Sequence, residues 1–216
     1  MKIGILFDLD GTLLDTLDDL HAAVNHTMTQ FGCPKRTREE VRRFVGNGVE
    51  ELVRLSLPGA KTDPDFTTVC TAYRNYYNAH AQEQTAPYPG IPDALKELAA
   101  EYPIAVVSNK PDAAVKLLCQ DYFGDVYALG QRSDIPRKPA PDMLHRAMAD
   151  LAVDACIYVG DSEVDVLAAK NAGVACLSVT WGFRDQDTLS QAGAATYCNH
   201  PADLPRCIRQ MVADIV

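Results

Sequence analysis

The sequence lacks the features of a disulfide-rich, zinc-binding or membrane-spanning protein. Its 7 cysteines are odd in number, widely scattered and without a C-x-x-C pair. Several lie in apolar stretches, where a thiol behaves as a small hydrophobic group, so we expect a reducing cytoplasm and neither a disulfide scaffold nor a zinc site. No apolar run approaches the length of a membrane span, and we expect no signal peptide and no membrane partner.

Positive charge is also scarce. The 216 residues include 20 Lys and Arg against 29 Asp and Glu, which gives a net charge of −9. A field of this sign argues against a nucleic-acid or anionic-membrane partner. A small anionic substrate would therefore need an isolated Lys or Arg close to its site. The length allows a core domain with a smaller companion, and the 47% hydrophobic content is ordinary for a globular chain.

The first apolar run ends in an unusual group of polar residues. Residues 3–7 indicate a buried strand, and Asp8, Asp10, Gly11 and Thr12 follow it. Residues two apart on an extended chain point to the same side, so the two carboxylates should project together. Their repulsion raises at least one pKa unless a cation offsets it. One carboxylate could then act as nucleophile or metal ligand while the other moves a proton.

Two simpler interpretations apply to this segment. A helix-loop-helix calcium site needs glycine sixth and glutamate twelfth in its loop. Counted from Asp8, those positions hold Leu13 and Asp19, so the calcium interpretation fails. An ordinary polar turn after a strand stays open from these residues alone.

Further strands alternate with helices along the rest of the chain. We predict strands at 104–107, 126–129, 156–159 and 174–179, with helices between them. This alternation predicts an α/β fold with a doubly wound parallel sheet. In such sheets ligands bind beyond the carboxyl ends of the strands. The polar residues expected there are Asp8, Asp10, Ser108, Lys138, Asp161 and Asp165.

The stretch between the first and second of these core strands is rich in helical pattern instead. Helices are predicted within 18–31, 38–57 and 65–81, and glycine and prolines near 84–92 mark the far border. We therefore predict a catalytic core formed by residues 1–15 and 88–216, with a small helical domain at 16–87 inserted after the first strand.

The acidic residues suit one metal. Asp8, Asp161 and Asp165 offer oxygen ligands without histidine or thiolate, and such a set is typical of Mg2+. Lys138 would balance the remaining charge and hold a phosphoryl oxygen, as would the Ser108 hydroxyl and nearby backbone N–H groups. Lys110 is interpreted either as an exposed lysine or as an aid to Lys138.

Four motifs resemble, in order, those of the haloacid dehalogenase-like hydrolases. They are Asp8 to Thr16, Ser108-Asn109, Lys138-Pro139 and Gly160 to Asp165. The resemblance implies a Rossmann-like core, a helical cap that closes over the site, and a phosphatase with an aspartyl-phosphate intermediate. It makes Asp8 the nucleophile and Asp10 the acid and base. It implies Mg2+ held by Asp8, the Asp10 carbonyl, Asp161 and Asp165, and phosphate held by Gly11, Thr12, Ser108, Asn109 and Lys138.

The inserted domain bears on the substrate. The segment 42–48, Arg-Arg-Phe-Val-Gly-Asn-Gly, resembles the cap loop of phosphoglycolate phosphatases, and Trp-Gly-Phe-Arg at 181–184 is similar to their stretch after the fourth strand. The resemblance implies a small phosphorylated metabolite as substrate, with phosphoglycolate the leading candidate. Backbone donors and an arginine would contact it, and the specificity residues would be Arg43, Gly46, Asn47 and Gly48. A loop with solvated arginines is the alternative.

Other activities remain alternatives. Pyrophosphatases and nucleotidases of the same family share much of the pattern. Sugar phosphomutases, which are isomerases, have a histidine twelve positions after the nucleophile, where this chain has Leu20. A non-catalytic phosphate-binding protein could have lost a catalytic aspartate or the lysine, and none is lost here. We expect a cytoplasmic monomer or homodimer.

Overall fold

The computed structural model describes residues 1–58 and 65–215. It separates into two compact units. The larger consists of Met1–Leu14 and Pro87–Val216, and the smaller of Asp15–Ala86. No helix among the described residues is long and apolar enough to cross a membrane.

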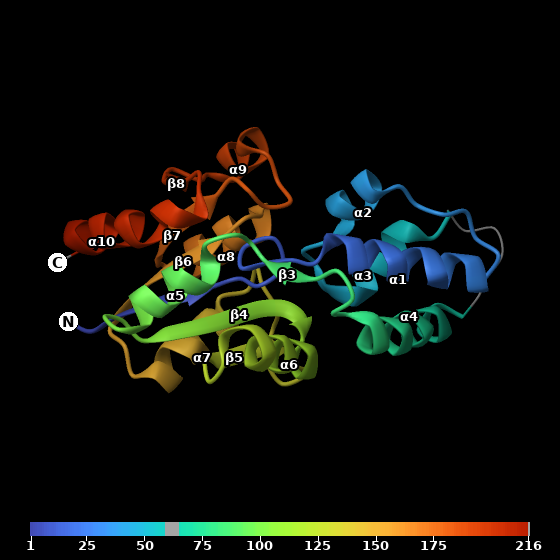
Figure 1. Ribbon diagram of the computed structural model, residues 1–216, viewed down its shortest axis with the longest axis horizontal. Helices are drawn as coiled ribbons and strands as arrows, with labels where there is room; N and C mark the ends of the chain where they lie inside the picture. Colours follow the sequence, from blue (N-terminus) through green and yellow to red (C-terminus); the bar gives the residue numbers. More distant parts are fainter. Residues whose placement is uncertain (59–64, 216) are drawn as a thin grey trace. The chain divides into compact units, whose positions relative to one another are not determined.

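The larger unit is built on a 6-stranded sheet of order β5-β4-β1-β6-β7-β8 (Figure 1). Every neighbouring pair in it is parallel, which confirms the predicted doubly wound α/β fold. The strand order reverses at β1, so a ligand-binding crevice is expected beyond its carboxyl end. The strands are β1 Ile3–Phe7, β4 Ile104–Pro111, β5 Tyr127–Gln131, β6 Ala155–Gly160, β7 Ala175–Val179 and β8 Tyr197–Cys198.

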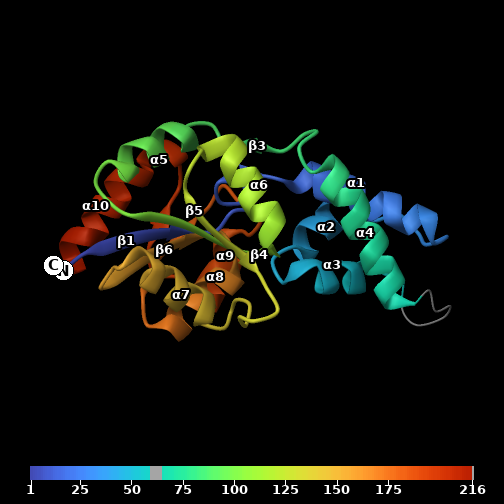
Figure 2. The ribbon, with the colours of Figure 1, turned by 90° about the horizontal axis from the view of Figure 1, so that it is seen from below.

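Helices cover both faces of this sheet because its strands are apolar on both sides. In β1, Ile5 and Phe7 pack on one face and Leu6 on the other, all of them fully buried. Burying each such side chain stabilises the fold by about 1.5–3 kcal/mol. Figure 2 shows α5, α6 and α10 against one face and α7 and α8 against the other. The helices are α5 Ile91–Ala99, α6 Asp112–Phe123, α7 Asp142–Leu151, α8 Glu163–Ala172, α9 Gln186–Ala192 and α10 Leu204–Ile215, with a short 3-10 turn at Pro201–Asp203.

Local sequence explains where α8 begins and ends. Ser162 and Asp165 form a capping box at its start, in which each side chain accepts a backbone N–H of the other. Gly173 ends the helix in the left-handed conformation, with φ 69°, as its position after the last helical turn predicts. The capping box fixes Asp165 at the carboxyl end of β6.

The smaller unit is helical. Its helices are α1 Leu17–Gln30, α2 Arg38–Phe44, α3 Gly48–Ser56 and α4 Phe66–His80. The single helical stretch predicted over 38–57 is two helices, because Gly46 and Gly48 take φ values of 123° and 81° that interrupt an α-helix. The Asp19 carboxylate accepts N–H groups of Gln84 and Thr85, which ties the two ends of the unit together. Strands β2 Leu14–Asp15 and β3 Ala86–Pro87 pair where the chain passes between the units.

Candidate active site

Three carboxylates meet at the carboxyl ends of β1 and β6. Asp8, Asp161 and Asp165 are buried, and each places an oxygen within 4.8 Å of the other two. The strands are direct neighbours, and the Asp8 N–H donates to the Val159 carbonyl at 2.8 Å. The topology therefore brings together three of the residues that the sequence placed at strand ends.

Lys138 lies within this cluster. Its side chain is 2% exposed, and Nζ lies 2.9 Å from Asp8 Oδ1 and 2.8 Å from Asp165 Oδ1. Lys138 is therefore the partner of Asp8 Oδ1, through this buried ion pair. Nζ also donates to the Tyr158 hydroxyl at 2.6 Å. Lys138 thus pairs with two of the three carboxylates.

Tyr158 is a site residue that the sequence analysis missed. Its buried hydroxyl lies 2.9 Å from Asp165 Oδ1 and 3.1 Å from the Val107 carbonyl, in addition to Lys138. A tyrosine in the middle of an apolar strand could have indicated this role, because a buried phenol hydroxyl needs a hydrogen-bond partner. Asp165 accepts at both oxygens, with the Ser162 N–H and hydroxyl on Oδ2. Asp165 therefore supports Lys138 and the start of α8.

Asp161 is held from two sides. Thr12 Oγ1 donates to Oδ1 at 3.0 Å, and the Phe183 N–H donates to Oδ2 at 2.7 Å. A Cβ atom on Gly11 or Gly182 would lie 2.4 Å or 2.3 Å from atoms of Asp161, so only glycine fits at these positions. The segment after β7, whose residues 181–184 were noted for their resemblance, thus contributes directly to the site by holding Asp161.

Asp10 pairs with a different lysine. Lys110 Nζ lies 2.7 Å from Asp10 Oδ1, and the two side chains are 4% and 12% exposed. The interpretation of Lys110 as an exposed lysine is wrong. Strand β4 continues through Lys110 to Pro111, beyond the predicted end at residue 107, and this extension keeps the lysine within the crevice.

The residues predicted to bind phosphate are placed in different ways. The Asn109 carboxamide donates to the Lys138 carbonyl and accepts its N–H, both at 2.9 Å, so this side chain positions Lys138. The Ser108 hydroxyl is buried and accepts the Lys110 N–H at 3.3 Å. Gly11 turns the chain with φ 84°. Their contacts with phosphate remain predictions.

Burial and mutual repulsion dominate the electrostatics of the cluster. Burial, with the charge of Asp165, raises the pKa of Asp8 from 3.8 to about 7, against the opposing effect of Lys138. Burial and the charges of Asp165 and Asp8 raise the pKa of Asp161 to about 8. Although burial works against a charged lysine, Asp165 and Asp8 raise the pKa of Lys138 above its ordinary value. The cluster carries an excess of negative charge that a cation would relieve.

The donor set fits Mg2+. Among the described residues, the group that could hold a metal consists of three carboxylates, with no histidine or cysteine in it. Burial and mutual repulsion make the charged forms of Asp8 and Asp161 costly, and a bound cation would offset that cost. Hard oxygen donors favour Mg2+ over softer metals. Asp8, Asp161 and Asp165 would be the candidate ligands, and hydrogen bonds already reach both oxygens of Asp161 and both oxygens of Asp165.

The predicted specificity residues lie in the smaller unit. Arg43 is exposed and pairs with Glu39 at 2.9 Å, and Arg42 pairs with the same carboxylate at 2.7 Å. Gly46 and Asn47 lie in the break between α2 and α3, and Gly48 is the first residue of α3. Their role toward a substrate remains a prediction.

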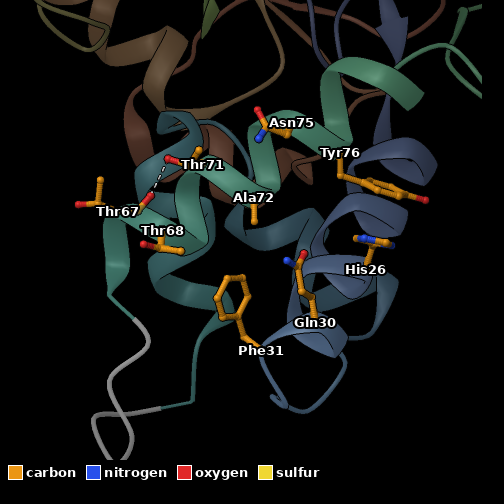
Figure 3. A pocket seen from close by; sticks show the side chains of 9 residues that line it. All are labelled: His26, Gln30, Phe31, Thr67, Thr68, Thr71, Ala72, Asn75 and Tyr76. Atoms are coloured by element: carbon orange, nitrogen blue, oxygen red, sulfur yellow. Dashed lines mark hydrogen bonds between the residues drawn. The ribbon is translucent and has the colours of Figure 1, made fainter.

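A depression of about 480 Å³ in the smaller unit is a weaker candidate (Figure 3). It lies between α1 and α4, and the described residues that line it include no Lys, Arg, Asp or Glu. A phosphorylated substrate needs cationic partners, and these described residues offer only the imidazole of His26. Its lining residues are His26, Gln30, Phe31, Thr67, Thr68, Thr71, Ala72, Asn75 and Tyr76.

Comparisons with known proteins agree with the geometry. Residues 5–179 match the model of a haloacid dehalogenase-like hydrolase family. A phosphoglycolate phosphatase from Cereibacter sphaeroides is 34% identical over 97% of this chain and 99% of its own length. The crystal structure of a putative phosphoglycolate phosphatase from Lactobacillus delbrueckii has a TM-score of 0.89 and 35% identity over 95% of this chain and 97% of that one. The structure of CbbY from Rhodobacter sphaeroides in complex with phosphate has a TM-score of 0.82 and 27% identity over 97% of this chain and 100% of that one.

Proposed function

This chain belongs to the haloacid dehalogenase-like hydrolases and is a phosphoric monoester hydrolase, and on that premise we propose that it is a Mg2+-dependent phosphatase acting through a phosphorylated Asp8. The observation that supports this proposal is the buried cluster of Asp8, Asp161 and Asp165 around Lys138, at the sheet's switch point. Asp10 lies two residues from the nucleophile, within the same crevice.

In the first half-reaction, an oxygen of Asp8 attacks the phosphorus of the substrate. The new P–O bond forms as the ester P–O bond breaks, and Asp10 gives its proton to the departing alkoxide. Lys138 and the Ser108 hydroxyl hold phosphoryl oxygens. When bound, Mg2+ supplies positive charge that offsets the repulsion between the carboxylates and the phosphate.

In the second half-reaction, water attacks the phosphorus of the phosphorylated Asp8. Asp10 takes the proton of this water, the P–O bond to Asp8 breaks, and orthophosphate leaves. Asp8 returns as a carboxylate and Asp10 as an acid, so the cycle balances. Proton transfer by a positioned group typically contributes about 10²- to 10⁴-fold.

Mg2+ should stabilise the protein more at high pH than at low pH. The raised pKa values of Asp8 and Asp161 mean that the folded state holds protons that the unfolded state releases. Their contribution to the stability of metal-free protein therefore falls as pH rises from about 4 to about 8. Mg2+ must displace these protons, so its Kd should be higher near pH 5.5 than near pH 8. At one Mg2+ concentration, about 100 times the Kd at pH 8, we expect a Tm increase of about 5–10 °C near pH 8 and a smaller one near pH 5.5.

Thermal unfolding with Mg2+ and with chelator, at both pH values, measures this effect. Asp161→Asn, which removes one proposed ligand, is the variant in which the increase should shrink. An equal increase at both pH values, or one that Asp161→Asn leaves intact, would argue against a metal on these carboxylates.

We propose further that the smaller unit acts as a cap and that phosphoglycolate is the substrate. The matches to phosphoglycolate phosphatases over nearly the whole chain support this choice. Arg43 and the N–H groups at Gly46, Asn47 and Gly48 would contact the substrate carboxylate. This part of the proposal rests on the resemblance of the 42–48 segment.

Phosphate release from a panel of substrates tests the function. The panel holds phosphoglycolate, pyrophosphate, nucleotides, sugar phosphates and p-nitrophenyl phosphate, each assayed with Mg2+ and with chelator. We expect metal-dependent release concentrated on phosphoglycolate. Release concentrated on another phosphate ester would support the proposed phosphatase mechanism but reject phosphoglycolate as the substrate. No phosphate release from any substrate of the panel would reject the proposed phosphatase activity.

A further inference from the structure

We infer that Lys110 is a positioning residue, which holds the Asp10 carboxylate in place for its two proton transfers. The inference rests on the proposed function, because it assigns Asp10 the roles of acid and base. It assigns different roles to the two buried lysines, Lys138 and Lys110. Lys138 pairs with Asp8 and Asp165, whereas Lys110 pairs with Asp10.

The ion pair between Lys110 and Asp10 is short and largely shielded from water. Nζ lies 2.7 Å from Oδ1, with the lysine side chain 4% exposed and the aspartate side chain 12% exposed. A charge-assisted hydrogen bond of this length is roughly twice as strong as a neutral one. Water and salt screen it much less than an exposed pair. The pair therefore restrains the rotation of the Asp10 side chain.

The backbone of Lys110 is itself fixed. Its N–H donates to the Ser108 hydroxyl at 3.3 Å. On the neighbouring strand, a Cβ atom on Gly130 would lie 2.8 Å from the Lys110 carbonyl oxygen, so the two backbones pack in direct contact. The Gly130 N–H donates to Asp112 Oδ1 at 3.0 Å, which holds the chain just beyond β4. These contacts hold the backbone from which the Lys110 side chain extends.

Positioning matters for Asp10 because proton transfer requires close alignment with the leaving oxygen. A misplacement of about 1 Å can cost about 10²-fold in rate. Loss of Lys110 removes this ion pair and weakens the restraint on the Asp10 side chain. The loss should be large for an alkyl phosphate, whose leaving alkoxide needs the proton. It should be small for p-nitrophenyl phosphate, whose leaving group departs without one.

The test compares kcat/KM for two esters, because kcat/KM reports the steps up to the transfer of the phosphoryl group to Asp8. The esters are the alkyl phosphate that wild type hydrolyses fastest in the panel and p-nitrophenyl phosphate. Lys110→Met removes the charge and keeps the length, and Lys110→Arg restores a cation. Lys116→Met is the matched control, because Lys116 forms an exposed pair with Asp112 on the adjoining helix.

For Lys110→Met we expect kcat/KM to fall about 10- to 100-fold on the alkyl ester and less than about 3-fold on p-nitrophenyl phosphate. The loss should reside in kcat rather than KM. Lys110→Arg should recover part of it, and Lys116→Met should match wild type on both esters.

Three outcomes would overturn the inference. Equal losses on the two esters would indicate a structural role, a rise in KM alone would indicate substrate binding, and no loss would show that Asp10 does not depend on Lys110. Failure of the proposed function is distinct, because wild type would then hydrolyse neither ester. If Lys110→Met fails to fold, the same ester comparison with Lys110→Gln decides between these roles.

Discussion

Asp8→Asn is expected to abolish turnover. The carboxamide has nearly the same shape but cannot accept a phosphoryl group to form a stable acyl phosphate. Removing a nucleophile from a catalytic unit typically costs at least about 10⁴-fold in rate, since its partners cannot act without it. We therefore expect metal-dependent phosphate release to fall by about 10⁴-fold or more. Phosphate release by Asp8→Asn within about 10-fold of wild type would show that Asp8 is not the nucleophile.

This loss should occur without loss of stability. In the metal-free protein Asp8 is one of three buried carboxylates and shares Lys138 with Asp165, and burial with the charge of Asp165 raises the pKa of Asp8 to about 7. Replacing it with a neutral group removes repulsion, so near pH 8 in chelator the Tm of Asp8→Asn should exceed that of wild type. Asp187→Asn, at an exposed position in α9, is the control and should change neither activity nor Tm.

Lys138→Met should cause large losses of both stability and activity. The lysine is nearly fully buried and lies within 2.9 Å of oxygens of Asp8 and Asp165. Removing one partner of a buried pair leaves uncompensated charge and typically costs about 3–5 kcal/mol. The carboxylates would then titrate at still higher pH, so the loss should be greatest near pH 8 and smaller near pH 5.5.

Urea unfolding of the metal-free protein at these two pH values measures this effect. Lys116→Met is again the control, because an exposed pair contributes at most about 1 kcal/mol. Phosphate release should fall with Lys138→Met even when Mg2+ restores part of its stability, because Mg2+ replaces charge but not the donor to the phosphoryl oxygen. A free energy of unfolding equal to that of wild type at pH 8 would contradict the charge balance described for the cluster.

The outline of the fold and the convergence of the site followed from local signals. Short apolar runs that end in polar groups, separated by helical pattern, specify a parallel sheet. In such a sheet the strand ends share one edge, so Asp8 and Asp161 had to come close although they are distant in sequence.

The partners of individual side chains did not follow from the sequence. Lys110 pairs with Asp10, and Asn109 holds Lys138, through contacts that depend on how far β4 extends. Tyr158 stands in a strand whose pattern shows only that it is buried. Gly182 approaches Asp161 because of a turn after β7, and nothing in the local pattern indicates which residue that turn will meet. Periodicity predicts which face is buried, whereas these contacts depend on the direction and length of each side chain.

Identification of the residue that is phosphorylated during turnover tests the role of Asp8 most directly. Wild type is incubated with Mg2+ and radiolabelled substrate, quenched in acid, and digested for peptide mapping. We expect label in the peptide that contains Asp8, released by hydroxylamine as an acyl phosphate should be, and no label in Asp8→Asn. Label on another residue, or turnover with water attacking the substrate directly and no protein-bound phosphate, would contradict the mechanism.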